Sequence, residues 1–142
     1  MLKGIPEVIP PKLMKYMMEM GHGDVLLIAD ANYPAKANAQ RYIRIEGVGT
    51  EELLDAILNY YPLDVYVDEP VKLMRPLPEE PRAEIWNQYE EIIRKHDDEK
   101  AFRGFGFIDR LPFYDESRAA YVIVQTNTAA RYANIMLKKG VI

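Results

Sequence analysis

The stretch Val25-Leu26-Leu27-Ile28-Ala29 is an unbroken apolar run of strand length, and it ends at Asp30. A strand with apolar side chains on both faces is typical of a sheet that helices cover on both sides. Open α/β sheets collect their ligands at the edge where such strands end. The run therefore predicts a central strand with a candidate site at its carboxyl end, where Asp30 either contacts a ligand or caps the following turn.

Helical and strand patterns alternate on both sides of this run. Helices are expected from Pro11 to just before Gly21, from Thr50 with its hydroxyl as the N-cap, and over 85–93. Short strands are expected over 42–45, 105–109, 120–126 and 135–137. Residues 65–74 are expected to be mostly extended with an interruption near Asp68–Pro70, 34–40 to be a loop, and 115–118 to be a helical turn. This alternation predicts an α/β fold, a three-layer α/β/α sandwich with a central mixed sheet, in a single domain over residues 1–142.

The composition is that of an ordinary packed protein. The 142 residues are 49% hydrophobic and 28% charged, with a net charge of -4. No run of Lys and Arg alternates with aromatic residues, so we expect no nucleic-acid partner. The first eleven residues lack a signal-peptide pattern, and no apolar run approaches the roughly 18 residues of a membrane span. The sequence therefore predicts a cytoplasmic protein with no membrane partner.

Cysteine is absent, and the only two histidines are His22 and His96. The absence of cysteine excludes disulfides, thiol nucleophiles and cysteine-ligated metal centres. A single histidine near carboxylates such as Asp24 is a weak metal signature, and no Gly-rich phosphate loop is present. We therefore expect no metal and no cofactor. His96 lies in a charged helix end, where we expect a solvated position.

His22 lies in the segment Gly21-His22-Gly23-Asp24, whose glycines allow a tight turn. It is the one candidate whose unperturbed pKa is near neutrality, which suits a proton carrier. A histidine that interacts with the carboxyl end of a helix is the alternative. If the first helix and the strand are antiparallel, His22 lies near the start of the strand and Asp30 at its end. Proximity of the two within one subunit is then not guaranteed.

Three further candidates lie in the last third of the chain. Arg110 follows an expected strand and offers five donors in a fixed fork, a geometry suited to neighbouring sugar hydroxyls. A salt bridge is the alternative role for Arg110. Tyr132 and Asn134 supply donors and acceptors, although Tyr132 also fits a core aromatic with a bonded hydroxyl.

Several segments, taken together, form a pattern that is specific to one protein family. They are Met1–Pro6, Glu19–Asp24 with Ile28–Ala35, Pro62–Tyr66, Asp109–Tyr114 and Tyr132–Gly140. Over essentially the whole chain they resemble the family that contains L-fucose mutarotase and D-ribose pyranase. The resemblance implies an isomerase that interconverts the α and β anomers of a free sugar. It implies His22 as the acid/base, and Asp30, Arg110, Tyr132 and Asn134 as substrate-binding residues. It also implies a homo-oligomer, a ring-shaped decamer with sites near subunit boundaries, which would bring His22 and Asp30 together.

Arg110 favours the fucose branch, because the ribose branch resembles His at that place. Two features depart from the fucose pattern: Thr126-Asn127-Thr128 where relatives carry Thr-Gly-Glu, and Ala133, which resembles the ribose branch. We therefore expect L-fucose as the substrate, with D-ribose pyranase activity or non-catalytic sugar binding as alternatives. Anomer exchange needs only a positioned acid and base, which typically contribute about 10²–10⁴-fold.

Overall fold

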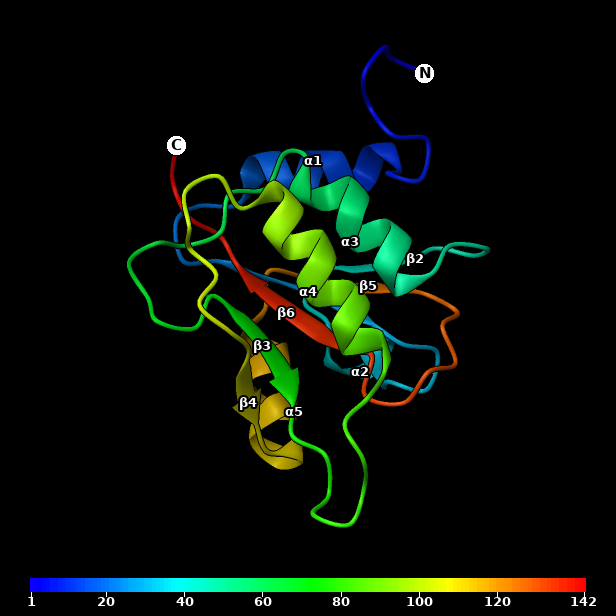
Figure 1. Ribbon diagram of the computed structural model, residues 1–142. Coiled ribbons are helices and arrows are strands. Elements are labelled where there is room, and N and C mark those ends of the chain that lie inside the picture. Colours follow the sequence, from blue (N-terminus) through cyan, green and yellow to red (C-terminus); the bar gives the residue numbers. More distant parts are fainter.

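A computed structural model describes residues Met1 to Ile142, and it contains one six-stranded sheet (Figure 1). The helices are α1 (Pro11–Glu19), α2 (Ala35–Asn38), α3 (Thr50–Leu58), α4 (Ile85–His96) and α5 (Arg110–Ala119). The strands are β1 (Val25–Ala29), β2 (Tyr42–Arg44), β3 (Val71–Met74), β4 (Gly106–Ile108), β5 (Val122–Gln125) and β6 (Ile135–Lys138). No helix is long and apolar enough to cross a membrane.

The sheet is mixed, with strand order β2-β5-β1-β6-β3-β4. Strand β6 runs antiparallel to its neighbours β1 and β3, and all other neighbouring pairs are parallel. The carboxyl ends of β1 to β5 therefore lie at one edge, together with the start of β6. We call this the carboxyl edge, and the opposite one the amino edge.

Side chains of β1 alternate between two cores, as the continuous apolar run predicts. Leu26 and Ile28 belong to a large core shared with α1, α3 and α4, whereas Leu27 and Ala29 belong to a smaller core with residues of α2 and α5. All four side chains are fully buried, and burying a Leu or Ile side chain contributes roughly 1.5–3 kcal/mol. Figure 1 shows α1, α3 and α4 on one face of the sheet and α5 on the other. The predicted three-layer α/β/α fold is confirmed.

Two segments differ from the sequence prediction because their side chains pack on the smaller core. The expected loop over 34–40 contains the short helix α2, whose Ala35 is buried there. The expected helical turn over 115–118 is part of the ten-residue helix α5, which buries Phe113 and Ser117 one turn apart. Pro112 lies in the first turn of α5, where a missing N–H costs no hydrogen bond.

Two further expectations about local structure are wrong. Extended chain over 65–74 is limited to β3, because residues 65–68 already form turns and bends ahead of the expected interruption near Asp68–Pro70. Gly49, and not Thr50, is the N-cap of α3. The Thr50 hydroxyl instead lies 2.6 Å from the hydroxyl of Tyr89 on α4. The buried Tyr89 hydroxyl also donates to the carbonyl oxygen of Ala133, 2.6 Å away, and so joins α3, α4 and the segment before β6.

We expect Tyr89→Phe to lower the free energy of unfolding by about 1–3 kcal/mol, because it leaves the buried Ala133 carbonyl without its donor. Urea denaturation followed by circular dichroism measures this change. Tyr66→Phe is the matched control, since the Tyr66 side chain is exposed. Equal stability of the two variants would contradict the prediction.

Candidate functional site

Asp30 lies at the carboxyl edge, directly after β1, and is buried. Its Oδ1 accepts hydrogen bonds from the backbone N–H groups of Asn32 and Tyr33, each at 2.9 Å. Asp30 therefore does cap the following turn. Burial raises the pKa of Asp30, and the bonds from the two backbone N–H groups partly oppose that rise.

Asn134 lies beside Asp30 because of the antiparallel register of β6. Ile135, the first residue of β6, pairs with Ile28 of β1, which places the preceding Asn134 next to the end of β1. Its Oδ1 accepts a hydrogen bond from the backbone N–H of Asp30 at 2.8 Å. The sheet itself thus holds the Asn134 side chain against the backbone of Asp30.

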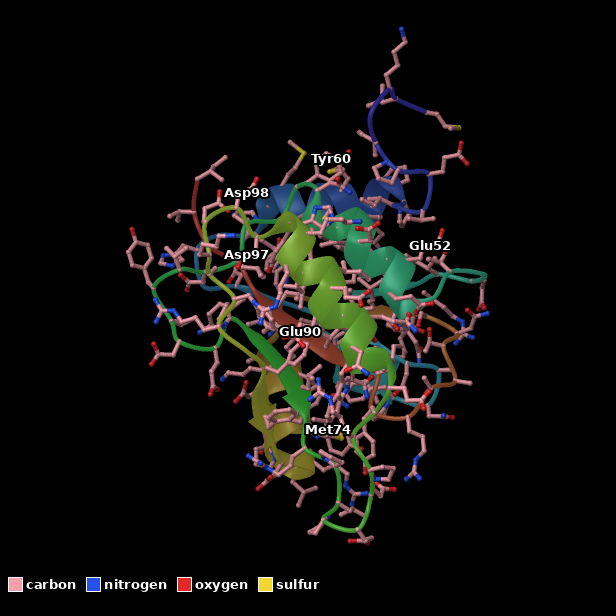
Figure 2. All side chains as sticks on the ribbon, in the orientation of Figure 1. Glu52, Tyr60, Met74, Glu90, Asp97 and Asp98 are labelled. Atoms are coloured by element: carbon pink, nitrogen blue, oxygen red, sulfur yellow. The ribbon has the colours of Figure 1, made fainter.

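Tyr132 completes this group and lies in the left-handed region of the backbone, with φ of 55°. Together with Asp30 and Asn134 it lines a cavity of about 210 Å³. The other lining residues are Asn32, Tyr33, Pro34, Met74, Tyr114 and Arg131. Figure 2 labels Met74, which marks the carboxyl end of β3. Sites for drug-sized ligands start at about 300 Å³, so this polar cavity suits a smaller molecule.

Arg110 is the first residue of α5 and borders the same edge of the sheet. It is exposed, and Tyr114, four residues later on α5, lines the cavity. Residues four apart share one face of a helix, so Arg110 lies on the cavity side of α5. The alternative role in a salt bridge is not found, since the neighbouring carboxylate of Asp109 pairs with Arg75 at 2.9 Å instead.

His22 lies at the amino edge, away from the other candidates. The five residues of β1 lie between it and Asp30, which at about 3.3 Å per residue is roughly 16 Å of strand. The His22 side chain is 46% exposed, and its Nε2 lies 3.1 Å from Oδ1 of Asp64. Its ring also packs edge to face against Tyr66. One chain therefore brings Asp30, Tyr132 and Asn134 together, with Arg110 at the border, but not His22.

Asp64 is a residue of this region to which the sequence analysis assigned no role. Its side chain is 3% exposed, and its Oδ1 also accepts a hydrogen bond from the backbone N–H of Tyr66 at 3.0 Å. Close chain approach holds it there: a Cβ on Gly140 would lie 2.5 Å from the carbonyl oxygen of Leu63. A carboxylate between the apolar residues Leu63 and Val65 is the signal that could have identified it.

His96 is not the solvated residue that the sequence predicted. Its side chain is 16% exposed, and its Nε2 lies 2.6 Å from Oδ1 of Asp55 on α3. Lys95 reaches the same oxygen at 2.6 Å. The group joins α4 to α3, so a structural role accounts for it. No cluster of three or more His, Cys, Asp or Glu side chains that could hold a metal ion is found.

The turn that departs from the fucose pattern is bonded to the segment that follows β1 and to the start of α3. Thr128 Oγ1 accepts a hydrogen bond from the backbone N–H of Thr50 at 2.9 Å. Its carbonyl oxygen accepts one from the backbone N–H of Ala31, also at 2.9 Å. Thr128 thus contacts the first residue of α3 through its hydroxyl and the segment that follows β1 through its backbone.

The fold and site define an α/β protein with a small polar cavity at one edge of its sheet and a histidine–carboxylate pair at the other. The chain belongs to the RbsD / FucU transport protein family, which its residues 3–142 match. It is 36% identical to the fucose mutarotase of Homo sapiens over 148 aligned residues, covering 99% of this chain and 94% of the relative.

Two solved structures share this fold. The fucose mutarotase from Streptococcus pneumoniae in complex with L-fucose superimposes with a TM-score of 0.92, at 45% identity and over 99% of both chains. Bacillus subtilis RbsD complexed with D-ribose superimposes with a TM-score of 0.74 over 100% of this chain and 99% of its own, at 18% identity. At this low identity, the similarity to RbsD shows a shared fold and nothing more.

The raised pKa of Asp30 generates a prediction about stability and pH. The folded protein holds the Asp30 proton more tightly than the unfolded chain does, so the resulting stabilisation is present at low pH and is lost as the pH rises through the raised pKa. We expect Asp30→Asn, whose amide oxygen can still accept the two backbone bonds, to be more stable than the wild type near pH 7. That advantage should shrink as the pH falls towards about 4, the ordinary range of a carboxyl group.

Urea unfolding at the two pH values measures the difference. The control is Asp68→Asn, whose parent side chain is 94% exposed, and which should show no such pH-dependent advantage. An advantage of Asp30→Asn that grows on acidification would show that the assigned direction of the pKa shift is wrong.

Proposed function

We propose that this chain is an isomerase that interconverts the α and β anomers of free L-fucose by acid/base-assisted opening and closure of the sugar ring. Residues 1–142 form the one sugar-mutarotase domain. The main structural support for this proposal is the polar cavity at the carboxyl edge, which is lined by Asp30, Asn134 and Tyr132. The full-length similarity to fucose mutarotases supports the choice of reaction and sugar.

The reaction requires two proton movements and no redox or group-transfer step. A base removes the proton of the anomeric hydroxyl while an acid protonates the ring oxygen. The bond between the anomeric carbon and the ring oxygen breaks, and an open aldehyde forms. Rotation about the bond next to the aldehyde, followed by the reverse proton movements, closes the ring as the other anomer. An acid and a base at hydrogen-bond distance are worth roughly 3–5.5 kcal/mol.

His22 is the proposed proton carrier, and Asp64 is proposed to orient it. In this proposal the Asp64 carboxylate accepts a hydrogen bond from the Nε2–H of His22 at 3.1 Å, which leaves Nδ1 as the nitrogen that exchanges protons with the sugar. Tyr33, whose pKa burial raises to about 12, keeps its proton at neutral pH and is not a competing base. Arg110 stays charged and only holds or polarises hydroxyl groups.

A complete site of this kind takes residues from two chains. His22 and Asp30 lie at opposite edges of one sheet, so a neighbouring subunit would supply His22 to the cavity that holds Asp30. We propose a homo-oligomer on this ground, with the ring-shaped decamer as its specific form. Large exposed apolar side chains such as Leu2 and Met18 offer surface for such contacts. A cytoplasmic location stays a prediction of the sequence.

We expect His22→Ala to keep the fold and to lose most of the acceleration, about 10²–10⁴-fold if His22 supplies the acid/base step. The half-exposed side chain is not part of either core. NMR saturation transfer between the anomeric protons of L-fucose measures the exchange rate. A folded His22→Ala protein that exchanges anomers at the wild-type rate would be a sugar-binding protein without this chemistry.

Mixing two variants extends this test to the sharing of residues between subunits. Asp30→Asn is expected to lose a charge-assisted contact to the sugar worth roughly 1.5–3 kcal/mol. Co-refolded His22→Ala and Asp30→Asn chains should recover exchange, because about a quarter of the sites in a random closed oligomer then carry both native residues. If each site lies within one chain, the mixture stays as inactive as its components.

Arg110 is proposed to set the preference for L-fucose over D-ribose. Its fork can engage two adjacent hydroxyls, whereas an imidazole offers one contact on that side. We expect wild type to exchange L-fucose faster than D-ribose, and Arg110→His to depress fucose exchange more, by a factor that corresponds to about 1–3 kcal/mol for a lost contact. The test is to measure the exchange rates of both sugars side by side for wild type and Arg110→His. Arg75→His is the control at this edge, and an equal loss on both sugars would reject the role of Arg110.

A further inference from the structure

The Pro-rich segment 75–84 joins β3 to α4, and Figure 1 shows it as the green loop that projects beyond the end of β3. Most of its side chains point to solvent. Glu80 is a charged residue that does not, since its side chain is only 15% exposed. Its carboxylate accepts a hydrogen bond from the hydroxyl of Tyr132 and pairs with the guanidinium of Arg131. One residue of a projecting loop is therefore bonded to two residues that line the candidate cavity.

Tyr132 needs such support because its backbone conformation is unfavourable. A non-glycine residue with φ of 55° costs free energy that the surroundings must offset. The backbone carbonyl of Tyr132 accepts a hydrogen bond from Trp86 Nε1 at 2.8 Å. The Tyr132 hydroxyl oxygen accepts a weaker bond from the backbone N–H of Leu77 at 3.4 Å. Glu80 is the charged partner among these three, and charge-assisted bonds are the stronger kind.

We propose that Glu80 is a positioning residue for sugar binding, which holds the side chains of Tyr132 and Arg131 at the wall of the cavity. The inference rests on the proposed function, because it takes this cavity as the sugar site. The loop between β3 and α4 then acts as a part of the site, although none of its residues needs to touch the sugar. Loss of the Glu80 charge should free both side chains and weaken binding, while the proton transfer by His22 is unaffected.

The test compares Glu80→Gln with Glu79→Gln, a matched change at the exposed neighbouring position. Saturation transfer over a range of L-fucose concentrations gives the half-saturating concentration and the maximal exchange rate. We expect Glu80→Gln to raise the half-saturating concentration on the order of tenfold and to leave the maximal rate within about twofold. Glu79→Gln should match wild type in both.

Two further measurements separate positioning from a merely structural role. Trp86 is the only tryptophan of the chain, and it is bonded to Tyr132, so its fluorescence reports on the position of that residue. Glu80→Gln should shift the Trp86 emission and Glu79→Gln should not. Tyr132→Phe combined with Glu80→Gln should raise the half-saturating concentration by less than the product of the two single effects. Each single substitution already disrupts the bond between Glu80 and Tyr132, so the second substitution has less left to remove.

Equal half-saturating concentrations and emission for Glu80→Gln and Glu79→Gln would overturn the proposal. The proposal would also be overturned if the double variant raised the half-saturating concentration by the full product of the two single-variant effects. A Glu80→Gln protein that loses maximal rate and thermal stability together, at an unchanged half-saturating concentration, would also overturn it. A wild-type protein that binds L-fucose without exchanging its anomers contradicts the proposed reaction and leaves the positioning test intact, since a titration of the Trp86 emission with L-fucose then gives the half-saturating concentration in place of saturation transfer.

Discussion

The antiparallel course of β6 between β1 and β3 determines which side chains meet at the carboxyl edge. Because β6 runs against its neighbours, its first residue and not its last lies beside the end of β1. Asn134 thereby reaches Asp30, and Tyr132, two residues earlier, lies over the end of β3. A slip of the register by one residue would turn every side chain of β6 to the other face of the sheet. The apolar residues of β6 on the two cores oppose such a slip.

The sequence predicts the elements whose signal is local and strong. The run over 25–29 matches β1 at both ends, and helical spacing finds α1 and α4. Helix α5 is less evident, because its apolar face is short and Pro112 interrupts the pattern. The direction of β6 has no signal in its four residues, since parallel and antiparallel strands of this length read alike. Its direction is nevertheless what assembles the candidate site.

The side chains whose contacts the sequence did not predict have one thing in common. Each interacts with a residue that is far away in the sequence. Thr50 has the hydroxyl of an N-cap, but Tyr89, 39 residues later, bonds that hydroxyl. His96 lies in a charged run, yet Asp55 on another helix binds it. Asp64 is assigned no role by the sequence, and its carboxylate pairs with His22, 42 residues before it. Local propensity is a weak guide wherever a tertiary partner offers a stronger interaction, and buried polar side chains are the positions where such partners are found.

The position of His22 has a consequence for how catalysis would depend on assembly. Its imidazole is half exposed and lies at the edge away from the cavity, so a lone chain holds the proposed sugar-binding groups without the proposed proton carrier. With His22 supplied by a neighbouring subunit, as proposed, the active fraction follows the association equilibrium by mass action. The modest demand of the chemistry makes this arrangement workable, because an acid and a base within hydrogen-bond reach of the sugar supply the required roughly 3–5.5 kcal/mol. Selection for activity would then act on the contacts between subunits as directly as on the cavity, since either alone leaves the anomers to exchange at their rate in water.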